Sequence, residues 1–488
     1  MYSRRVFVYV IIVASTPLPS EGLCISKAQR TQKMDKMDPC LSSKPITSLS
    51  SIKAAPLSSR YHFNHADEGL CGVAGSQKVI LMLNSLRTGV TKISLNHNSL
   101  GDDGTCQLFA YLSSTEGSKH RSTVAEIGLT NNNIGCEGLR AIAEFVRGND
   151  VLRTLWLTNN AFTPDPVILT DFANALNSSR LCLVSLTGNA QLGDLFVEKF
   201  LPFLRSRSLQ ELHINTIGLT PRGASAIAAW VSGSRKGGSQ GACYLHIFKC
   251  SGNNLGVRGV WEVIRAIEKG NWALSKVEMY ANQLAEPQLQ LLASGQSLME
   301  PPRDQPSGIP ETEEGWKDCE RGLHRVIMRN QYWRRRTEKE ACNLLRYARP
   351  LLMYTKLPST PSMSPHTSNP SMSTTLFPFF ALPNELKLYI LALFAPSLSS
   401  AQRVRIYKYA SDPATLPSLI PTFRWGVGIE YLADPSNLGV SSYGLGCPDG
   451  KYMGACNTII CRREAERAKF LEAVGCCSYE PELEGFVD

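Results

Sequence analysis

Aromatic and charged side chains that recur at matched offsets inside a repeated phrase have the clearest potential for chemistry. Alternate side chains of a β-strand point to the same face, so residues at matched offsets in successive strands share one surface. Aromatic side chains bury a large area at small entropic cost, and charged side chains add complementarity and steering. The candidate binding residues are Lys92, Glu126, Arg153, Trp156, Glu211, His213, Lys249, Glu278 and Tyr280, with Lys276 beside them.

These residue types predict recognition of a partner protein, with Trp156 and Tyr280 as the strongest contacts. The alternative is that the Trp156 ring lies flat across neighbouring strands without a partner, and that the polar residues around it form a solvated face.

The sequence lacks the common signatures of enzymes. It contains no G-x-x-x-x-G-K-[ST] phosphate loop and no H-E-x-x-H motif. Residues 419–488 contain five cysteines but no C-x-x-C pair and no histidine, which favours free or locally paired thiols over a zinc site. These cysteines are Cys447, Cys456, Cys461, Cys476 and Cys477. We therefore expect no enzyme activity, catalytic residue, metal, cofactor or small-molecule substrate.

One hydrophobic phrase recurs seven times between residues 90 and 284. Its clearest copy runs from Val124 to Ile134 and follows the pattern L-x-x-L-x-L-x-x-N-x-L. The first apolar anchors of the copies are Val90, Val124, Leu152, Leu181, Leu209, Leu245 and Leu274. Their spacing gives a unit of about 28 to 29 residues, with polar insertions at 113–122 and 232–241. We expect both insertions to be surface loops.

Each copy predicts a short strand, a turn and an amphipathic helix. The first, fourth and sixth positions place apolar side chains inward, and an Asn at the ninth position can satisfy backbone groups where the chain turns. That position holds Asn98, Asn132, Asn160, Asn189, Asn253 and Asn282. The fifth copy has Ile217 there, and the fourth has an extra residue after Asn189, so we expect irregular structure at both. Residues 57–86 resemble a degenerate first unit, as is typical of a terminal repeat.

Stacking such units gives an α/β solenoid, a horseshoe with parallel strands on the concave face and helices outside. The unit length and the full helix in each unit resemble the ribonuclease-inhibitor-like class of leucine-rich repeats, which includes the Ran GTPase-activating proteins. The resemblance covers about 200 of the 488 residues. It implies a binding surface for a protein, such as a small GTPase. No catalytic loop of that family can be matched residue by residue, so no catalytic site is carried over.

Composition and the first residues bear on the compartment. The formal net charge of +9 and the pI of about 8.8 are only mildly basic. Residues 1–20 combine Arg4 and Arg5 with an apolar run, which is typical of a secretory signal peptide. The 15 cysteines are odd in number and scattered through the repeats, as free thiols are in reducing compartments. We predict a cytoplasmic or nuclear protein, with secretion as the alternative.

The composition changes at several predicted boundaries. Residues 1–55 form a targeting-like or disordered segment, 56–295 the repeat domain, and 296–355 a linker and a basic helix. Residues 356–378 are a Ser/Pro-rich tether, and 379–488 a mainly helical C-terminal module.

The basic helix is expected over residues 323–354, with a break near Pro350. Its arginines and lysine between 325 and 349 lie among apolar residues, which favours a solvated helix that caps the solenoid. The alternative is a surface for an acidic partner, nucleic acid or a membrane.

The C-terminal module begins with Leu382-Pro-Asn-Glu-Leu-Lys-Leu-Tyr-Ile-Leu. This start is similar to that of an F-box, and the resemblance implies docking to the adaptor of a cullin ubiquitin ligase. The sequence from Gln402 onward lacks the Cys-Arg and Trp ending of that family, and the segment follows its repeats instead of preceding them. A helix pair packed on its own domain is therefore the favoured interpretation of 382–410.

Taken together, the sequence predicts a non-catalytic leucine-rich-repeat scaffold that binds a partner protein on its concave face. A GTPase activator of the Ran type is the first alternative. An F-box-like substrate receptor of a ubiquitin ligase is the second.

Overall fold

The structure is a computed structural model, and it describes residues 62–233, 244–284, 311–354, 382–416 and 459–482. All described residues belong to one compact unit. Several expectations fall outside the described residues: the signal-like N-terminus, most of the second insertion, the tether, and Cys447 and Cys456.

Eight short parallel strands form a single sheet whose strand order follows the chain. The strands are β1 (His62–Asn64), β2 (Lys92–Ser94), β3 (Glu126–Gly128), β4 (Thr154–Trp156), β5 (Leu183–Ser185), β6 (Glu211–His213), β7 (Ile247–Lys249) and β8 (Lys276–Glu278). Each strand pairs in register with the next, so equivalent phrase positions lie side by side. The predicted α/β class and the repeated strand-helix unit are confirmed.

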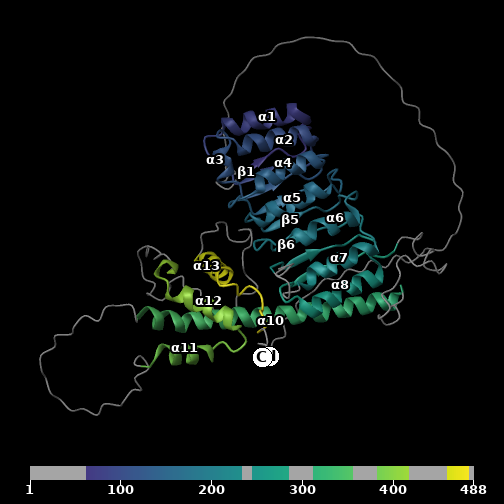
Figure 1. The fold of residues 1–488 in the computed structure, drawn as a ribbon. Coiled ribbons are helices and arrows are strands. Elements are labelled where there is room, and N and C mark those ends of the chain that lie inside the picture. Colours follow the sequence, from purple (N-terminus) through teal and green to yellow (C-terminus); the bar gives the residue numbers. More distant parts are fainter. Residues whose placement is uncertain (1–61, 234–243, 285–310, 355–381, 417–458, 483–488) are drawn as a thin grey trace, which may run out of the picture. The chain divides into compact units, whose positions relative to one another are not determined.

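A helix follows each of the first seven strands (Figure 1). These helices are α1 (Gly72–Ser85), α2 (Gly101–Ser113), α4 (Cys136–Val146), α5 (Pro166–Asn177), α6 (Gly193–Phe200), α7 (Pro221–Ser232) and α8 (Gly256–Gly270). The 3-10 turn η2 (Leu201–Phe203) extends α6. The unit formed by β1 and α1 agrees with the expected degenerate first repeat.

The core lies between the sheet and these helices. The middle residue of every strand is buried there, as are all seven predicted anchors. The middle residues are Phe63, Ile93, Ile127, Leu155, Val184, Leu212, Phe248 and Val277. Because side chains alternate along a strand, the first and third strand residues face away from the helices.

The predicted asparagines satisfy the backbone at the turn after each strand. Asn160 accepts hydrogen bonds from the backbone N–H groups of Asn132 and Ile134, and its amide donates to Leu157 O. Ile217 is buried at the one position that lacks an Asn. Its own N–H donates to Asn253 Oδ1 at 3.0 Å, the same bond that the N–H groups of Asn132 and Asn160 make to the next copy.

The first insertion differs from the expected polar loop. It contains a four-residue helix, α3 (Ser118–Arg121), in which His120 is fully buried. His120 Nδ1 accepts from Val90 N at 3.3 Å, and Nε2 donates to Leu83 O at 3.1 Å. The imidazole therefore joins two repeats, a role that the polar composition of the insertion did not indicate.

The basic helix is longer than predicted and is not broken at Pro350. Helix α10 (Glu313–Tyr354) has 42 residues and includes Pro350. Leu351 is buried beyond the proline, and the Arg349 guanidinium donates to Thr415 O, so packing holds the last turn despite the missing N–H.

Helix α10 caps the last repeats. Arg329 donates to the carbonyls of Ile267, Glu268 and Asn271 at the C-terminal end of α8. Its guanidinium also lies 3.9 Å from the centroid of the Trp272 ring. Asn330 donates to the carbonyls of Asn271 and Leu274. Part of the basic character of this segment thus serves the solenoid itself.

The C-terminal helices pack on α10 around a second hydrophobic core. They are α11 (Asn384–Ala392), α12 (Ser400–Ser411) with the turn η5 (Pro413–Thr415), and α13 (Ile459–Ala473). Ser399 and Gln402 form a capping box at the start of α12. Leu391 and Ile406 are buried in this core together with Leu344 and Phe470 of α10 and α13. The packing agrees with the favoured interpretation of 382–410 as helices packed on their own domain.

Candidate functional site

The first and third residues of the strands share the side of the sheet that faces away from the repeat helices, which we call the open strand face. The first residues in register are Lys92, Glu126, Thr154, Leu183, Glu211, Ile247 and Lys276. The third residues are Ser94, Gly128, Trp156, Ser185, His213, Lys249 and Glu278. Eight of the nine predicted binding residues therefore lie on this face or directly after a strand.

Trp156 leans across the middle of the open strand face. Its ring centroid is 5.9 Å from that of His213, although β4 and β6 are two strands, or about 10 Å, apart. Ser185 on the intervening strand is only 1% exposed. The ring thus covers β5, as the alternative interpretation expected, while one side stays accessible because Trp156 is only half-buried.

A charged pair fixes the other edge of the Trp156 ring. Trp156 Nε1 donates to Glu126 Oε1 at 3.2 Å, and Lys92 Nζ lies 2.9 Å from the same oxygen. Lys92 and Glu126 therefore hold the indole in one orientation. A rigid aromatic side chain loses little entropy on binding, which favours a role as a contact residue.

Glu211 joins His213 and Lys249. Its Oε1 lies 2.5 Å from His213 Nε2 and 3.3 Å from Lys249 Nζ. Burial lowers the pKa of His213, and the hydrogen bond to Glu211 opposes this shift only in part. The imidazole is therefore neutral near pH 7 and donates its Nε2 proton to the carboxylate.

A carboxylate and a neutral imidazole are two parts of a catalytic triad, and the third part is a nucleophile. Within the described ranges, no serine, threonine or cysteine side chain forms a hydrogen bond with His213. Ser185, the nearest hydroxyl in the register, is bonded to Thr158 and Thr187 instead. The arrangement suits a fixed polar contact better than nucleophilic catalysis.

Lys276, Glu278 and Tyr280 form the end of the face near β8. Lys276 Nζ lies 2.6 Å from Glu278 Oε1. Burial and the Glu278 carboxylate raise the pKa of the Tyr280 hydroxyl, so it remains a neutral donor and acceptor. The net charge of the open strand face is zero, because its three basic residues are balanced by three acidic ones. These residues are Lys92, Lys249 and Lys276, and Glu126, Glu211 and Glu278.

Arg153 lies apart from the other predicted residues. It directly precedes β4, at the N-terminal edge of the sheet. Its Nη1 donates to Arg180 O at 3.1 Å. Residues that precede the strand do not follow the alternation that orients the strand residues. The structure therefore does not bring Arg153 into the charged group around Glu211.

Leu183 and Ile247 are half-buried residues of the open strand face that the sequence interpretation missed. Both are paired with Glu211, Leu183 from β5 and Ile247 from β7. Period-two alternation could have found them, since they occupy the same phrase position as Lys92 and Glu126. They therefore flank Glu211 on the open strand face and, like Trp156, add apolar surface among its charged groups.

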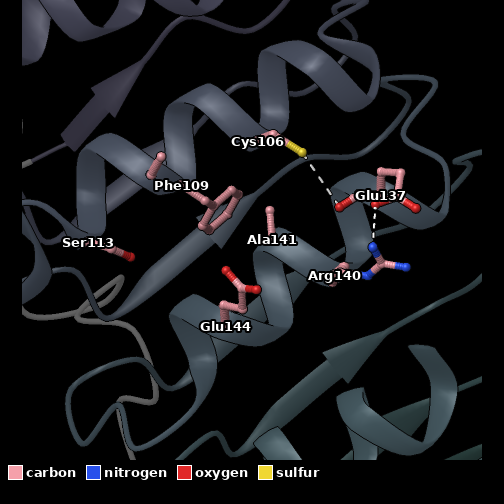
Figure 2. Close-up of a pocket in the computed structure, with 8 residues that line it drawn as sticks. Cys106, Phe109, Ser113, Glu137, Arg140, Ala141 and Glu144 are labelled. Carbon is pink, nitrogen blue, oxygen red and sulfur yellow. Dashed lines mark hydrogen bonds and ion pairs between the residues drawn. The ribbon is translucent and has the colours of Figure 1, made fainter. Parts of the chain in front are cut away.

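A small groove lies on the opposite, helical side of the repeats (Figure 2). Cys106 and Phe109 of α2 line it opposite Glu137, Arg140 and Glu144 of α4, and Arg140 pairs with Glu137 at 2.8 Å. Burial, assisted by the carboxylates of Asp102 and Glu137, raises the pKa of the Cys106 thiol. A protonated thiol is a poor nucleophile, so the groove is a weak candidate for chemistry.

Two further observations concern other classes of site. Within the described ranges, no three His, Cys, Asp or Glu side chains are grouped so that they could hold a metal ion. None of the helices there combines the length and the hydrophobicity that a bilayer-spanning segment needs.

Comparison with known proteins gives no match, either to a protein-family model or to a curated protein. The argument for function therefore depends on the geometry of the open strand face.

Proposed function

We propose that this chain is a non-catalytic protein-binding scaffold whose open strand face contacts a partner protein. The observation that carries the proposal is that the open strand face combines the apolar side chains of Trp156, Leu183 and Ile247 with charged side chains that ion pairs hold in place. Protein interfaces commonly combine an apolar centre that contains an aromatic anchor with a polar rim. We also infer that the sheet curves as in the ribonuclease-inhibitor-like class, with this face on the concave side.

The balanced charge of the face bears on the kind of partner. A surface without a net charge provides little long-range steering, and its alternating charges favour one register of docking over others. We therefore expect a partner whose contact surface pairs opposite charges with Glu126, Glu211 and Lys249, and places an apolar group against Trp156.

The test compares two variants of the full chain. Trp156→Ala with Ile247→Ser removes two apolar side chains of the open strand face, and Leu81→Ala with Val167→Ala alters exposed apolar residues of α1 and α5 as a control. Partners are captured from a cytosolic extract, identified, purified and titrated. We expect the first variant to bind its partner at least about 30-fold more weakly, as for a hot spot of about 2 kcal/mol. Equal affinities for both variants would contradict the proposal.

The F-box-like receptor is the second candidate, and one observation favours it. Helix α11 exposes Leu386, Tyr389 and Leu393, which an adaptor could cover. A GTPase activator of the Ran type remains a prediction from the sequence resemblance. An activator would accelerate GTP hydrolysis by a Ran-like GTPase, whereas a receptor would retain the ligase adaptor through residues 382–410.

We place the protein in the cytoplasm or the nucleus. The supporting observation is that Cys106, Cys136, Cys182 and Cys250 of the repeats are free thiols.

A further inference from the structure

Helix α11 packs Leu388 and Leu391 inward but also presents several apolar side chains outward. Leu386, Tyr389, Leu393 and the adjacent Phe394 are 48%, 67%, 64% and 49% exposed. Lys387 is buried on the opposite side, close in the helical register to the buried Leu391. A helix on the surface of a globular domain normally carries polar residues on its outward side. The outward apolar side therefore requires an explanation beyond packing within the chain.

The exposed apolar surface continues onto α10. The rings of Tyr347 and Phe394 lie 4.8 Å apart, and Tyr347 is itself 46% exposed. Nearby, Ser397 N donates to Glu340 Oε2 at 2.8 Å, so the chain after α11 runs along α10. We define Tyr347, Leu386, Tyr389, Leu393 and Phe394 as the apolar patch.

Basic residues follow one side of α10 next to this patch. Arg325, Lys339 and Arg346 are exposed, and none forms an ion pair with another residue that the structure describes. With Tyr332 they are spaced seven residues apart, which keeps them on one side of the helix over roughly 31 Å. We call these four residues the basic stripe, and Arg346 directly precedes Tyr347 of the patch.

Other basic residues of α10 are used inside the protein. Arg334 pairs with Glu338, Arg336 pairs with Glu340, and Arg329 caps α8. The carboxylates of Glu338 and Glu340 are thus already engaged by these arginines and, for Glu338, by Arg467. By contrast, Arg325, Lys339 and Arg346 of the basic stripe have no carboxylate partner among the described residues.

We propose that the apolar patch and the basic stripe together form a peripheral docking surface for an anionic lipid bilayer. A bilayer surface offers apolar depth for leucine and aromatic side chains and negative headgroups for lysine and arginine. A single occupant of this kind satisfies both features over the length of the stripe. A helical protein partner would cover α11 but would leave most of the basic stripe without a counterpart.

The test is co-sedimentation of the full chain with vesicles. Vesicles of phosphatidylcholine alone are compared with vesicles that also contain phosphatidylserine. We expect binding to the second kind, falling with added salt. Leu386→Ser with Leu393→Ser should weaken it roughly tenfold, and Lys339→Glu with Arg346→Glu should weaken it by at least that factor. Circular dichroism confirms that these variants, which alter exposed side chains, are folded.

Matched controls separate this surface from the rest of the chain. Leu81→Ser removes an equally exposed leucine of α1, and Arg207→Glu reverses an exposed charge outside α10. Neither control should change vesicle binding. Absence of binding, or binding that all variants retain, would overturn the proposal. Retained binding would point instead to another segment, such as the apolar residues 6–14. Loss of binding when a ligase adaptor is added, with no effect of the basic stripe variant, would assign the patch to a protein.

Discussion

At the scale of single residues, the eighth position of every phrase has a left-handed backbone. It holds Asp67, His97, Asn131, Asn159, Gly188, Thr216, Gly252 and Ala281, with φ between 48° and 79°. Asparagine and glycine tolerate this region, whereas a β-branched residue such as Thr216 is strained in it. The left-handed residue turns the chain out of the strand, so all copies keep the same geometry even where the residue is unfavourable.

Thr216→Asn should therefore stabilise the protein. Relief of the left-handed strain at Thr216 is worth about 1 kcal/mol in the free energy of unfolding. The opposite effect is expected of Gly252→Ala, at the equivalent position of the next copy. A Cβ there would lie 2.5 Å from Thr216 Cγ2, and the φ of 69° disfavours alanine, so the protein should be destabilised. Urea unfolding with an unchanged slope measures both effects. A destabilised Thr216→Asn protein would show that the strain does not limit stability.

Buried histidines predict a loss of stability in mild acid. Burial lowers the pKa of His120, as it does for His213, and lowers the pKa of His246 to about 3. Above the unfolded value of about 6.5 both states are neutral and the pH has no effect through these groups. Below it the unfolded chain takes up protons that the folded chain does not, so stability falls as the pH falls.

The measurement is the free energy of unfolding between about pH 7 and pH 5. His120→Gln keeps a donor and an acceptor but does not titrate, so its stability should decline less steeply than that of the parent. His213 and His246 contribute to the slope that remains. An identical slope in parent and variant would exclude His120 as a source of the acid sensitivity.

At the scale of elements, side chains of one repeat organise the start of the next helix. Asp102 of α2 accepts hydrogen bonds from Gly135 N and Gly138 N at the start of α4, and Asp194 of α6 accepts from Thr220 N before α7. A carboxylate at a helix N-terminus satisfies unpaired N–H groups and complements the helix dipole. Neighbouring repeats are thus coupled by polar contacts as well as by their shared core.

The end of the last described repeat helix depends on α10 in a similar way. Arg329→Ala should lower the free energy of unfolding by about 2 kcal/mol, since it removes bonds to three carbonyls and the stacking on Trp272. Arg325→Ala, one turn earlier and exposed, is the matched control and should change stability by less than about 0.5 kcal/mol. Chemical denaturation of both variants gives the comparison, and equal effects would contradict the capping role.

At the scale of the whole molecule, the regular features were predictable and the exceptions were not. The spacing of anchors such as Val124 and Leu152 determines the strands, because one unit can bury its apolar face only by stacking on the next. Period-two alternation then orients Trp156 and His213 correctly. It does not orient Arg153, which precedes its strand, and Leu183 and Ile247 were missed because apolar residues were assigned to the core.

Long-range contacts account for the remaining differences. His120 bonds to Val90, which precedes β2, and to Leu83 of α1, both about 30 or more positions earlier, so its polar insertion gives no local indication of burial. Helix α10 continues past Pro350 because Arg349 and Leu351 pack against residues more than 30 positions later in the chain. Neither contact is visible in a short window of sequence.

The central claim is that the open strand face binds a partner protein, and crosslinking from that face tests it most directly. A photoreactive amino acid is introduced at Leu183 on β5, the strand next to that of Trp156, and separately at Val167, an exposed residue of α5 on the helical side. Both chains are irradiated in cells. The account predicts a discrete protein adduct from Leu183 that disappears with Trp156→Ala, and no such adduct from Val167. An adduct from Val167 alone, or a Leu183 adduct that does not depend on Trp156, would contradict it.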